Sequence, residues 1–390
     1  MKVCCKKADI ASGLAMVGRA TSNRALPILS TIKITTEQNR ILLEATNLEL
    51  GVQCRVDATV EQPGCCALPA RLLTDFIAVL PHETITIEVS ETHAGTITSE
   101  LSEAEIIGMD PNEFPRWPQA DENELSLHLA AQTIKEMVTD VAFSASTDDD
   151  RPAFTGICIQ VGRNGEGKIT CAAADAYRLA VRSEVLEGDV PEPVELVVPA
   201  KTLKEIATLL PTQGMVSLTV TAGKKQILFQ TDGVSLTSRL MDAAYPNFWQ
   251  MVPDNYSTRS VVETRLFAPV IKAAALFAQD ASHTLTLKLR PATGKITVSA
   301  SAEGIGANTS TLTATYSDPV EDFTMLFNVR YIADALAAMS SVPEIALELH
   351  NANRPGILRP VGKKDVLYLV MPMQVKRETK SRPATTTATS

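Results

Sequence analysis

The sequence lacks the motifs that mark the common catalytic and nucleotide-binding sites. It contains no Walker phosphate loop, no GxGxxG, no GxSxG and no HExxH. Its five histidines are scattered along the chain and form no metal-binding pattern. The sequence therefore offers no group of residues that favours catalysis, and we expect neither a cofactor nor a metal.

Cysteine usage and the lengths of the apolar runs exclude further classes of protein. The seven cysteines include two adjacent pairs and no CxxC spacing. Neighbouring strand residues point to opposite faces, so the pairs are poor chelates, and we expect buried free thiols. No apolar run reaches the roughly 18 residues that span a bilayer, and no signal peptide follows Met1. The chain is predicted to be soluble and cytoplasmic, with no membrane partner.

Charge and aromatic content are also informative. Aromatic residues make up only 5% of the chain, and the net charge is −9. This acidic balance argues against a protein that coats nucleic acid with its whole surface, although a locally basic face is compatible with it. Asp148–Asp150 is the most acidic run, but adjacent carboxylates lack the alternating spacing of a calcium loop. We interpret the run as a solvated loop; the alternative is an unrecognised acidic site in a β-rich cytoplasmic enzyme.

One stretch of the sequence occurs three times. Residues 198–211 read VPAKTLKEIATLLP, residues 68–81 read LPARLLTDFIAVLP, and residues 327–340 read FNVRYIADALAAMS. The corresponding residues Pro69, Pro199 and Asn328 lie 130 and 129 residues apart. A fixed period of this length predicts three tandem units in a chain of 390 residues.

Each copy of the repeat predicts a helix. Proline fits the first turn, and apolar residues follow at helical spacing. These residues are Leu72, Leu73, Phe76, Ile77 and Leu80 in the first copy, Leu203, Ile206, Ala207 and Leu210 in the second, and Ile332, Leu336 and Met339 in the third.

A second helix and about eight alternating strands complete each unit. The second helices are expected at residues 7–19, around Ile134, Met137, Val138 and Val141, and at 269–277, and the last strand is expected at 366–375. This pattern favours an α+β fold with two helices on antiparallel sheet in each unit. The predicted units are 1–122, 123–256 and 257–375, followed by a disordered tail at 376–390.

Positive charge recurs where a helix does not favour it. Arg71, Lys201 and Arg330 share one position just after the start of the three repeated helices. A cation there is unfavourable by about 0.3–1 kcal/mol, because the helix N-terminus is already positive. Lys204 lies on the same class of helix. An ordinary solvated surface explains any one of them, but the repetition favours sequence-independent contact with DNA phosphates.

Several motifs, in this order and on this period, resemble the bacterial DNA polymerase III beta subunit family, the beta sliding clamps. They are RALPILSTIKI at 24–34, LPARLL, AADAYRLAV at 173–181, VPAKTL, YPNFWQMVP, FNVRYIADAL and YLVMPMQV at 368–375. The resemblance covers residues 1 to about 375. It implies three domains of the DNA-clamp (processivity) fold per chain, closing as a homodimeric six-domain ring around double-stranded DNA. It also implies a non-catalytic protein that tethers DNA polymerase III for processive replication.

The resemblance further implies a hydrophobic pocket for short peptides of partner proteins. Expected partners are the DNA polymerase III alpha subunit, the clamp loader, repair polymerases, ligase-type proteins and other clamp-motif proteins. The implied pocket residues are Phe154, Ala174, Ala176, Tyr177, Arg178, Leu179, Pro246, Gln250, Met251, Asn328, Tyr331, Leu369, Val370, Met371, Pro372, Met373, Gln374 and Val375.

The same resemblance assigns a DNA contact to Arg24, and ring closure to Ile106 against Leu276 and Phe277. The chain differs from the family pattern at several pocket positions. Ala176 and Tyr177 stand where the family often has glycine and histidine, and Gln250 and Gln374 where it often has arginine. A third class, a β-rich ligand-binding or surface protein, is disfavoured by the missing signal peptide.

Overall fold

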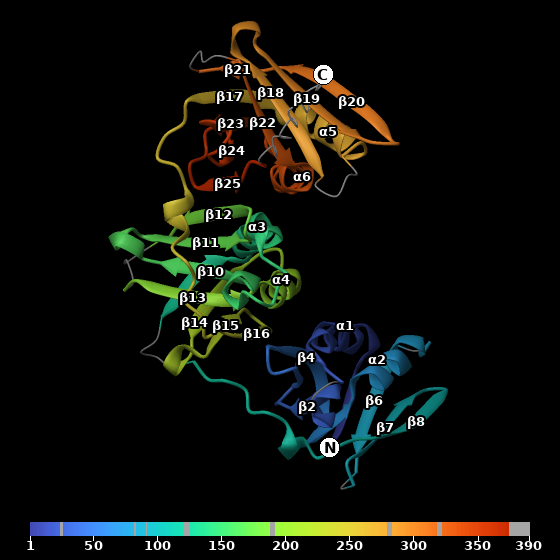
Figure 1. Ribbon diagram of the computed structural model, residues 1–390. Helices are drawn as coiled ribbons and strands as arrows, with labels where there is room; N and C mark the ends of the chain where they lie inside the picture. The colour runs from blue at the N-terminus through green and yellow to red at the C-terminus, as the bar shows by residue number, and fades with distance from the viewer. Residues whose placement is uncertain are drawn as a thin grey trace, which may run out of the picture. The chain divides into compact units, whose positions relative to one another are not determined.

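A computed structural model describes residues 1–23, 26–81, 83–90, 92–120, 125–187, 192–278, 283–317 and 322–373 (Figure 1). The chain divides into two compact units. Unit 1 comprises residues 1–175 and 181–246, and unit 2 comprises residues 176–180 and the chain from Asn247 onward.

Six α-helices occur in the described residues, and each follows a strand without an intervening loop. They are α1 (Lys7–Val17), α2 (Ala70–Val79), α3 (Ala131–Val141), α4 (Ala200–Leu209), α5 (Thr264–Ala275) and α6 (Val329–Ala338). None of them is long and apolar enough to cross a membrane. The helices pack in pairs, α1 with α2, α3 with α4 and α5 with α6 (Figure 1).

Unit 1 contains two sets of antiparallel strands. The first runs in the order β8 (Ser102–Ile107), β7 (Ala94–Ser99), β6 (Thr84–Val89), β1 (Lys2–Lys6), β4 (Leu50–Gln62), β16 (Val234–Arg239), β15 (Gln226–Gln230), β14 (Met215–Val220) and β9 (Ser126–Ala130), with β3 (Arg40–Thr46), β2 (Thr31–Thr36) and β5 (Cys65–Pro69) branching from β4. The second runs in the order β13 (Val194–Pro199), β10 (Gly156–Val161), β11 (Lys168–Ala174) and β12 (Arg178–Val185). Residues 178–180 at the start of β12 belong to unit 2.

The strands β4 and β16 join the first two sequence repeats into one sheet. Leu236 lies opposite Val52, and the pairing runs from Val234 with Cys54 to Ser238 with Leu50. Consecutive residues are buried on both strands where they pair, from Leu50 to Cys54 on β4 and from Ser235 to Ser238 on β16, so both faces of the sheet are covered at this seam. Unit 1 is therefore held together by backbone hydrogen bonds between the two repeats.

Unit 2 contains the third repeat. One set of strands runs β25 (Val366–Val370), β24 (Gly356–Pro360), β23 (Glu344–Leu349), β17 (Thr258–Glu263) and β21 (Thr315–Tyr316); the other runs β20 (Gly306–Thr313), β19 (Lys295–Ala302), β18 (Thr284–Arg290) and β22 (Phe323–Asn328). Each repeat thus has two helices with eight or nine strands, which confirms the predicted α+β architecture of three tandem domains.

The repeated helices bury the faces that the sequence predicts, with two exceptions in the first copy, Leu72 and the partly exposed Phe76. Leu203, Ile206 and Leu210 are buried in the second copy, and the third copy buries its apolar residues in the same way. In the first copy Leu72 is 55% exposed, so its predicted burial was wrong. The buried ridge there is Ala70, Leu73, Ile77 and Leu80, at spacings of three and four residues along one face.

Four other details of the prediction were wrong. Pro69 and Pro199 are the last strand residues and the N-caps of their helices, not members of the first turn. Helix α5 begins at Thr264 and includes Pro269. The helix accommodates this proline, because a proline in the second turn leaves only one helical hydrogen bond unmade. The last strand ends at Val370, earlier than predicted.

The cysteines are free in the described structure, as predicted, but they are not all buried. Cys66 is buried and Cys65, next to it on β5, is exposed, because adjacent strand residues face opposite sides. Burial raises the pKa of the Cys66 thiol to about 12. Cys66 is therefore a thiol at physiological pH, with little tendency to react.

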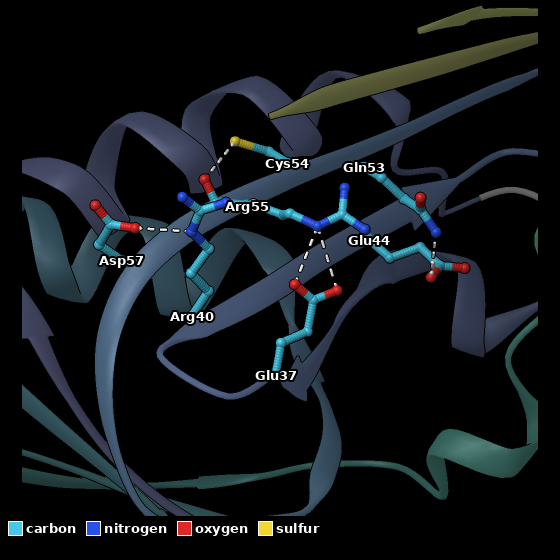
Figure 2. A network of polar contacts seen from close by, with 7 residues as sticks. All are labelled: Glu37, Arg40, Glu44, Gln53, Cys54, Arg55 and Asp57. Carbon is cyan, nitrogen blue, oxygen red and sulfur yellow. Dashed lines mark hydrogen bonds and ion pairs between the residues drawn. The ribbon is translucent and has the colours of Figure 1, made fainter. Parts of the chain in front are cut away.

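The strands β3 and β4 and the turn between β2 and β3 carry a network of polar contacts (Figure 2). Arg55 Nε donates to both carboxylate oxygens of Glu37, at 3.3 and 3.0 Å, and Arg40 Nε lies 3.0 Å from Asp57 Oδ1. Glu44 is buried, and Gln53 Nε2 donates to its Oε2 at 3.0 Å. Burial raises the pKa of Glu44, against the hydrogen bond from Gln53 and the charge of Lys33.

Candidate partner-peptide and DNA-contact surfaces

Residues 176–180 and helix α6 form an aromatic and charged cluster within unit 2. The rings of Tyr177 and Tyr331 are stacked, with centroids 6.3 Å apart and planes at 17°. The guanidinium of Arg178 lies 4.7 Å from the centroid of the Tyr331 ring, and its Nη1 is 2.5 Å from Asp334 Oδ2. Tyr331 and Asp334 are three residues apart on α6, so both face the same side of the helix.

The Arg178 cluster combines a fixed charge with accessible aromatic surface. The side chain of Arg178 is 13% exposed and that of Asp334 46%, so the ion pair is partly shielded from water. Tyr177 is exposed. A rigid aromatic surface beside a neutralised cation is suited to bind an apolar or aromatic side chain.

The segment after β25 is tied to the same cluster. Met371 N donates to Tyr177 O at 2.8 Å, and Met373 N donates to Leu326 O at 2.7 Å. Thr284 Oγ1 lies 3.9 Å from the sulfur of Met373. Met371, Pro372 and Met373 are all partly exposed, and such soft side chains adapt to varied ligands.

A 3₁₀ turn of unit 2 supplies two further predicted pocket residues. It spans Phe248–Met251 and follows Asn247, whose carbonyl accepts from Gln250 N at 3.3 Å. Gln250 is exposed and Met251 partly exposed. Buried Phe248 packs against Trp249, with ring centroids 5.0 Å apart, and anchors the turn.

Asn328 fixes the start of α6. Its side-chain oxygen accepts from Arg330 N at 2.9 Å, a contact that Pro69 and Pro199 cannot make at the equivalent positions. The side chain of Asn328 therefore has a structural partner already.

The predicted pocket residues of unit 1 gather around Tyr245. Ala174 N donates to Tyr245 Oη at 2.9 Å, and the Phe154 ring meets Tyr245 edge to face, with centroids 5.8 Å apart. Burial raises the pKa of Tyr245, partly opposed by the hydrogen bond from Ala174. Pro246, next in the chain, is exposed.

The four helical cations predicted to contact DNA are exposed. Arg71, Lys201 and Arg330 are each the second residue of their helix, and Lys204 lies one turn further along α4. Arg71 Nε is 3.7 Å from Asp75 Oδ2, with both side chains largely in water, so this pair is weak. Within the described residues no carboxylate lies within 4.0 Å of the other three cations.

The residues predicted for ring closure differ in exposure. Ile106 is 3% exposed because its side chain points into the core of its domain, whereas Ile107 beside it is 80% exposed on β8. In unit 2, Leu276 just after α5 is 65% exposed, and Phe277 is partly exposed. A one-residue shift moves a strand side chain to the opposite face, so Ile107 is the surface residue of this strand.

The Asp148–Asp150 run is an exposed loop without the geometry of a metal site. Ser146 Oγ accepts from Asp148 N at 3.0 Å, and Asp148 Oδ1 accepts from Asp150 N at 3.1 Å, which is an ordinary turn. Across the described parts of the chain no three His, Cys, Asp or Glu side chains gather as a metal site.

Comparison with known proteins identifies the family. Residues 1–118, 128–247 and 249–374 match, in turn, the N-terminal, central and C-terminal domains of the DNA polymerase III beta subunit. The chain is 31% identical to the beta sliding clamp of Synechocystis sp., over 96% of this chain and all of the relative. It belongs to the DNA polymerase III beta subunit family.

Two further relatives agree with this assignment. The beta sliding clamp of Staphylococcus aureus (strain Mu50) is 28% identical over 90% of this chain and 92% of its own length. The crystal structure of the DNA polymerase sliding clamp from Bacillus subtilis superposes with a TM-score of 0.90, at 27% identity, over 96% of this chain and 99% of that one. The predicted function of a DNA sliding clamp, a non-catalytic processivity factor, is confirmed, and the enzyme alternative is not supported.

Some residues predicted for the clamp's peptide pocket are buried in the described structure. Leu369 and Val370 on β25 are fully buried, and so are Ala174 and Leu179. These four residues are core residues that can shape a pocket from beneath but offer no free side chain. Ala176 is exposed. Gln374, Val375, the DNA-contact candidate Arg24 and the tail at 376–390 lie outside the described residues.

The sequence-based prediction missed two residues that organise these surfaces. Asp334 anchors Arg178, and its position three residues after Tyr331 is a signal that could have identified it. Tyr245 orients Ala174 and Phe154 in unit 1, and the aromatic residue before Pro246 is its only sequence signal. Both act on other residues through contacts that only the fold creates.

Proposed function

We propose that two copies of this sliding clamp close head to tail into a six-domain ring around duplex DNA in the cytoplasm. The observation that carries the proposal is the threefold placement of an exposed cation at the second position of α2, α4 and α6. Mobile Lys and Arg side chains bind phosphates without reading sequence, which suits a protein that slides. The proposed domains are 1–122, 123–256 and 257–375, and the segment 376–390 is proposed to be a dispensable tail.

A comparison of circular with linear DNA tests whether the clamp encircles the duplex. The clamp loaded on nicked circular DNA should stay bound, and linearising that DNA should release it by sliding off the ends. Release at equal rates from circular and linear DNA would contradict a ring.

The proposed DNA contacts are Arg71, Lys201, Lys204 and Arg330, together with Arg24. Replacing Arg71, Lys201 and Arg330 by Glu should weaken DNA binding and lower the salt dependence of log K by about 0.9 for each lost phosphate contact. The matched control replaces exposed Lys288, Lys295 and Lys363 by Glu, with the same change in net charge. Equal weakening in both variants would show that net charge, and not these positions, governs binding.

The proposed dimer contact brings β8 of one copy against the end of α5 of the other. Both β8 and β20 are sheet edges with unpaired backbone groups, and exposed Ile107 and Leu276 supply apolar surface near them. The clamp should have a mass of twice 42.0 kDa in solution. Ile107→Asp should shift it to the monomer, whereas Met215→Asp, an exposed apolar control in unit 1, should not.

The proposed peptide pocket binds short segments of the DNA polymerase III alpha subunit, the clamp loader, repair polymerases and ligase-type partners. Its accessible side chains are Tyr177, Tyr331, Met371 and Met373, with Gln250 and Met251 from the 3₁₀ turn; Phe154, Ala176, Pro246, Asn328 and Pro372 complete the proposed set, and Gln374 and Val375 extend it. Stacked aromatic and thioether surface supports this use.

A labelled peptide carrying the clamp-binding motif of the alpha subunit tests the pocket. Tyr177→Ala should weaken binding of this peptide by about tenfold, because the variant removes one ring of the stack. Tyr256→Ala changes another exposed tyrosine of unit 2 and should leave affinity unchanged. Unaltered binding to the Tyr177 variant would refute the assignment.

A further inference from the structure

A cavity of about 770 Å³ lies within unit 1, away from every residue assigned above. Its walls come from the turn between β3 and β4, from β13, from the turn between β14 and β15, and from the end of β16. We call it the Lys224 pocket, after its lining by Leu48, Glu195, Lys224, Lys225, Gln226 and Arg239.

The Lys224 pocket concentrates positive charge on an acidic protein. Lys224, Lys225 and Arg239 are all exposed, and among the described residues no carboxylate lies within 4.0 Å of their charged groups. Two carboxylates, Glu195 and Asp242, also line the cavity, and Glu195 Oε2 accepts from Gln160 Nε2 at 2.8 Å. The three cations are therefore available to a negatively charged ligand.

Two residues of the pocket have a backbone conformation that their side chains disfavour. Leu48 has φ 73° and Lys224 has φ 50°, both in the left-handed region. Leu48 also exposes its apolar side chain at the cavity. Such conformations cost about 1–3 kcal/mol each and gather at ligand-binding sites.

The pocket also contains the open edge of a strand, whose backbone groups can form hydrogen bonds with a ligand. Strand β13 is a sheet edge, and Val197 O, which points away from β10, accepts from Met241 N at 2.8 Å. The period of two places the N–H and C=O of Glu195 on the same open side. Gln226 Oε1 is buried, and none of the described residues donates to it.

We propose that the Lys224 pocket binds an extended acidic peptide segment of a partner protein. The carboxylates of the peptide pair with Lys224, Lys225 and Arg239, and its backbone pairs with the N–H and C=O of Glu195 at the edge of β13. A polyphosphate or nucleotide fits less well, because phosphate oxygens only accept, and none of the described lining residues has an aromatic side chain on which a base could stack.

The test uses the full-length chain and a fluorescent peptide of alternating Glu and Val. We expect binding that weakens at least tenfold in the Lys224→Glu/Lys225→Glu variant. The control Lys288→Glu/Lys295→Glu makes the same change in net charge on exposed residues of unit 2 and should bind as the parent does. Amide exchange of Glu195 should slow when the peptide binds.

Three results would overturn the proposal: equal weakening in the control pair, binding without protection of the Glu195 amide, or binding of tripolyphosphate by a chain that does not bind the peptide. If the charge-reversal variant does not fold, Lys224→Gln/Lys225→Gln replaces it in the test. This variant should also bind the peptide more weakly than the parent does. The DNA and partner-peptide experiments above use other residues, so failure here leaves them intact.

Discussion

Arg178 and Arg330 belong to the same unit and have opposite surroundings. Arg178 is nearly buried, paired with Asp334 and packed over Tyr331. Arg330, next to Tyr331 on α6, is exposed, and within the described residues no carboxylate lies within 4.0 Å of it. One helix thus uses one face to hold a cation in place and another to present one to solvent. The first arrangement stabilises the fold, and the second leaves the charge for a ligand.

The comparison predicts different effects on stability, which the two tryptophans can report separately. Trp117 lies in unit 1 and Trp249 in unit 2. In a Trp117→Phe background, Trp249 fluorescence reports the unfolding of unit 2 in urea. In a Trp249→Phe background, Trp117 fluorescence reports the unfolding of unit 1.

The largest effect is expected for Arg178→Ala. It leaves the partly shielded carboxylate of Asp334 without its partner and should lower the free energy of unfolding of unit 2 by about 2 kcal/mol. The double variant Arg178→Ala/Asp334→Ala should recover part of that loss, since no unpaired charge remains. Equal losses in the single and double variants would show that the ion pair contributes nothing by itself.

A smaller loss is expected at the start of the same helix. Asn328→Ala removes the acceptor of the Arg330 amide and should destabilise unit 2 by about 1 kcal/mol, measured by Trp249 fluorescence. Asn328→Asp keeps an acceptor and should retain the stability of the parent. If Asn328→Ala does not lower the stability of unit 2, the cap is unimportant and the Asn328 side chain is available to bind a ligand.

Glu44 extends the comparison to a buried carboxylate paired with a neutral amide. Its pKa is raised in the folded state, so the stability it contributes is present at low pH, below its unfolded pKa, and is lost as pH rises through the folded pKa. Glu44→Gln should therefore stabilise unit 1 at pH 8 by about 1 kcal/mol and flatten the dependence on pH above the unfolded pKa. Trp117 fluorescence checks this.

Glu37→Gln is the matched control for Glu44. Glu37 is partly exposed and ion-paired with Arg55, so the variant should instead change stability by less than about 1 kcal/mol. A decrease in stability at pH 8 for Glu44→Gln would contradict the argument from burial.

The smallest effect on stability belongs to Arg330. Arg330→Glu should change the free energy of unfolding of unit 2 by less than about 0.5 kcal/mol, because the side chain is exposed and no carboxylate of the described residues lies within 4.0 Å of it. DNA binding should weaken in the same variant. A large destabilisation would remove the contrast with Arg178.

Sequence periodicity predicted the repeat, the six helices and most strands, because local patterns fix these. It failed where a tertiary contact decides. Pro269 was predicted to begin a helix, but α5 begins five residues earlier, directly after the preceding strand ends. Ile106 and Ile107 are equally apolar, and only the pairing of β8 shows which one is exposed.

The candidate surfaces were predictable only in part, for the same reason. Tyr177, Arg178 and Tyr331 lie in recognisable motifs, whereas the contact of Arg178 with Asp334 joins residues 156 positions apart. The Lys224 pocket was not predicted at all. Lys224 and Lys225 are adjacent in the turn before β15, but Arg239 ends β16, and no spacing in the sequence relates it to the two lysines.

The seam between β4 and β16 has a mechanical consequence for the first two domains. Unfolding either domain would strip the other of a hydrogen-bonded neighbour in mid-sheet, so neither can melt alone without exposing an edge. The covalent connection through Arg116 is then secondary to the seam. A tryptic nick after Arg116 should leave the two fragments bound, and gel filtration of the nicked chain should then show a single undissociated species.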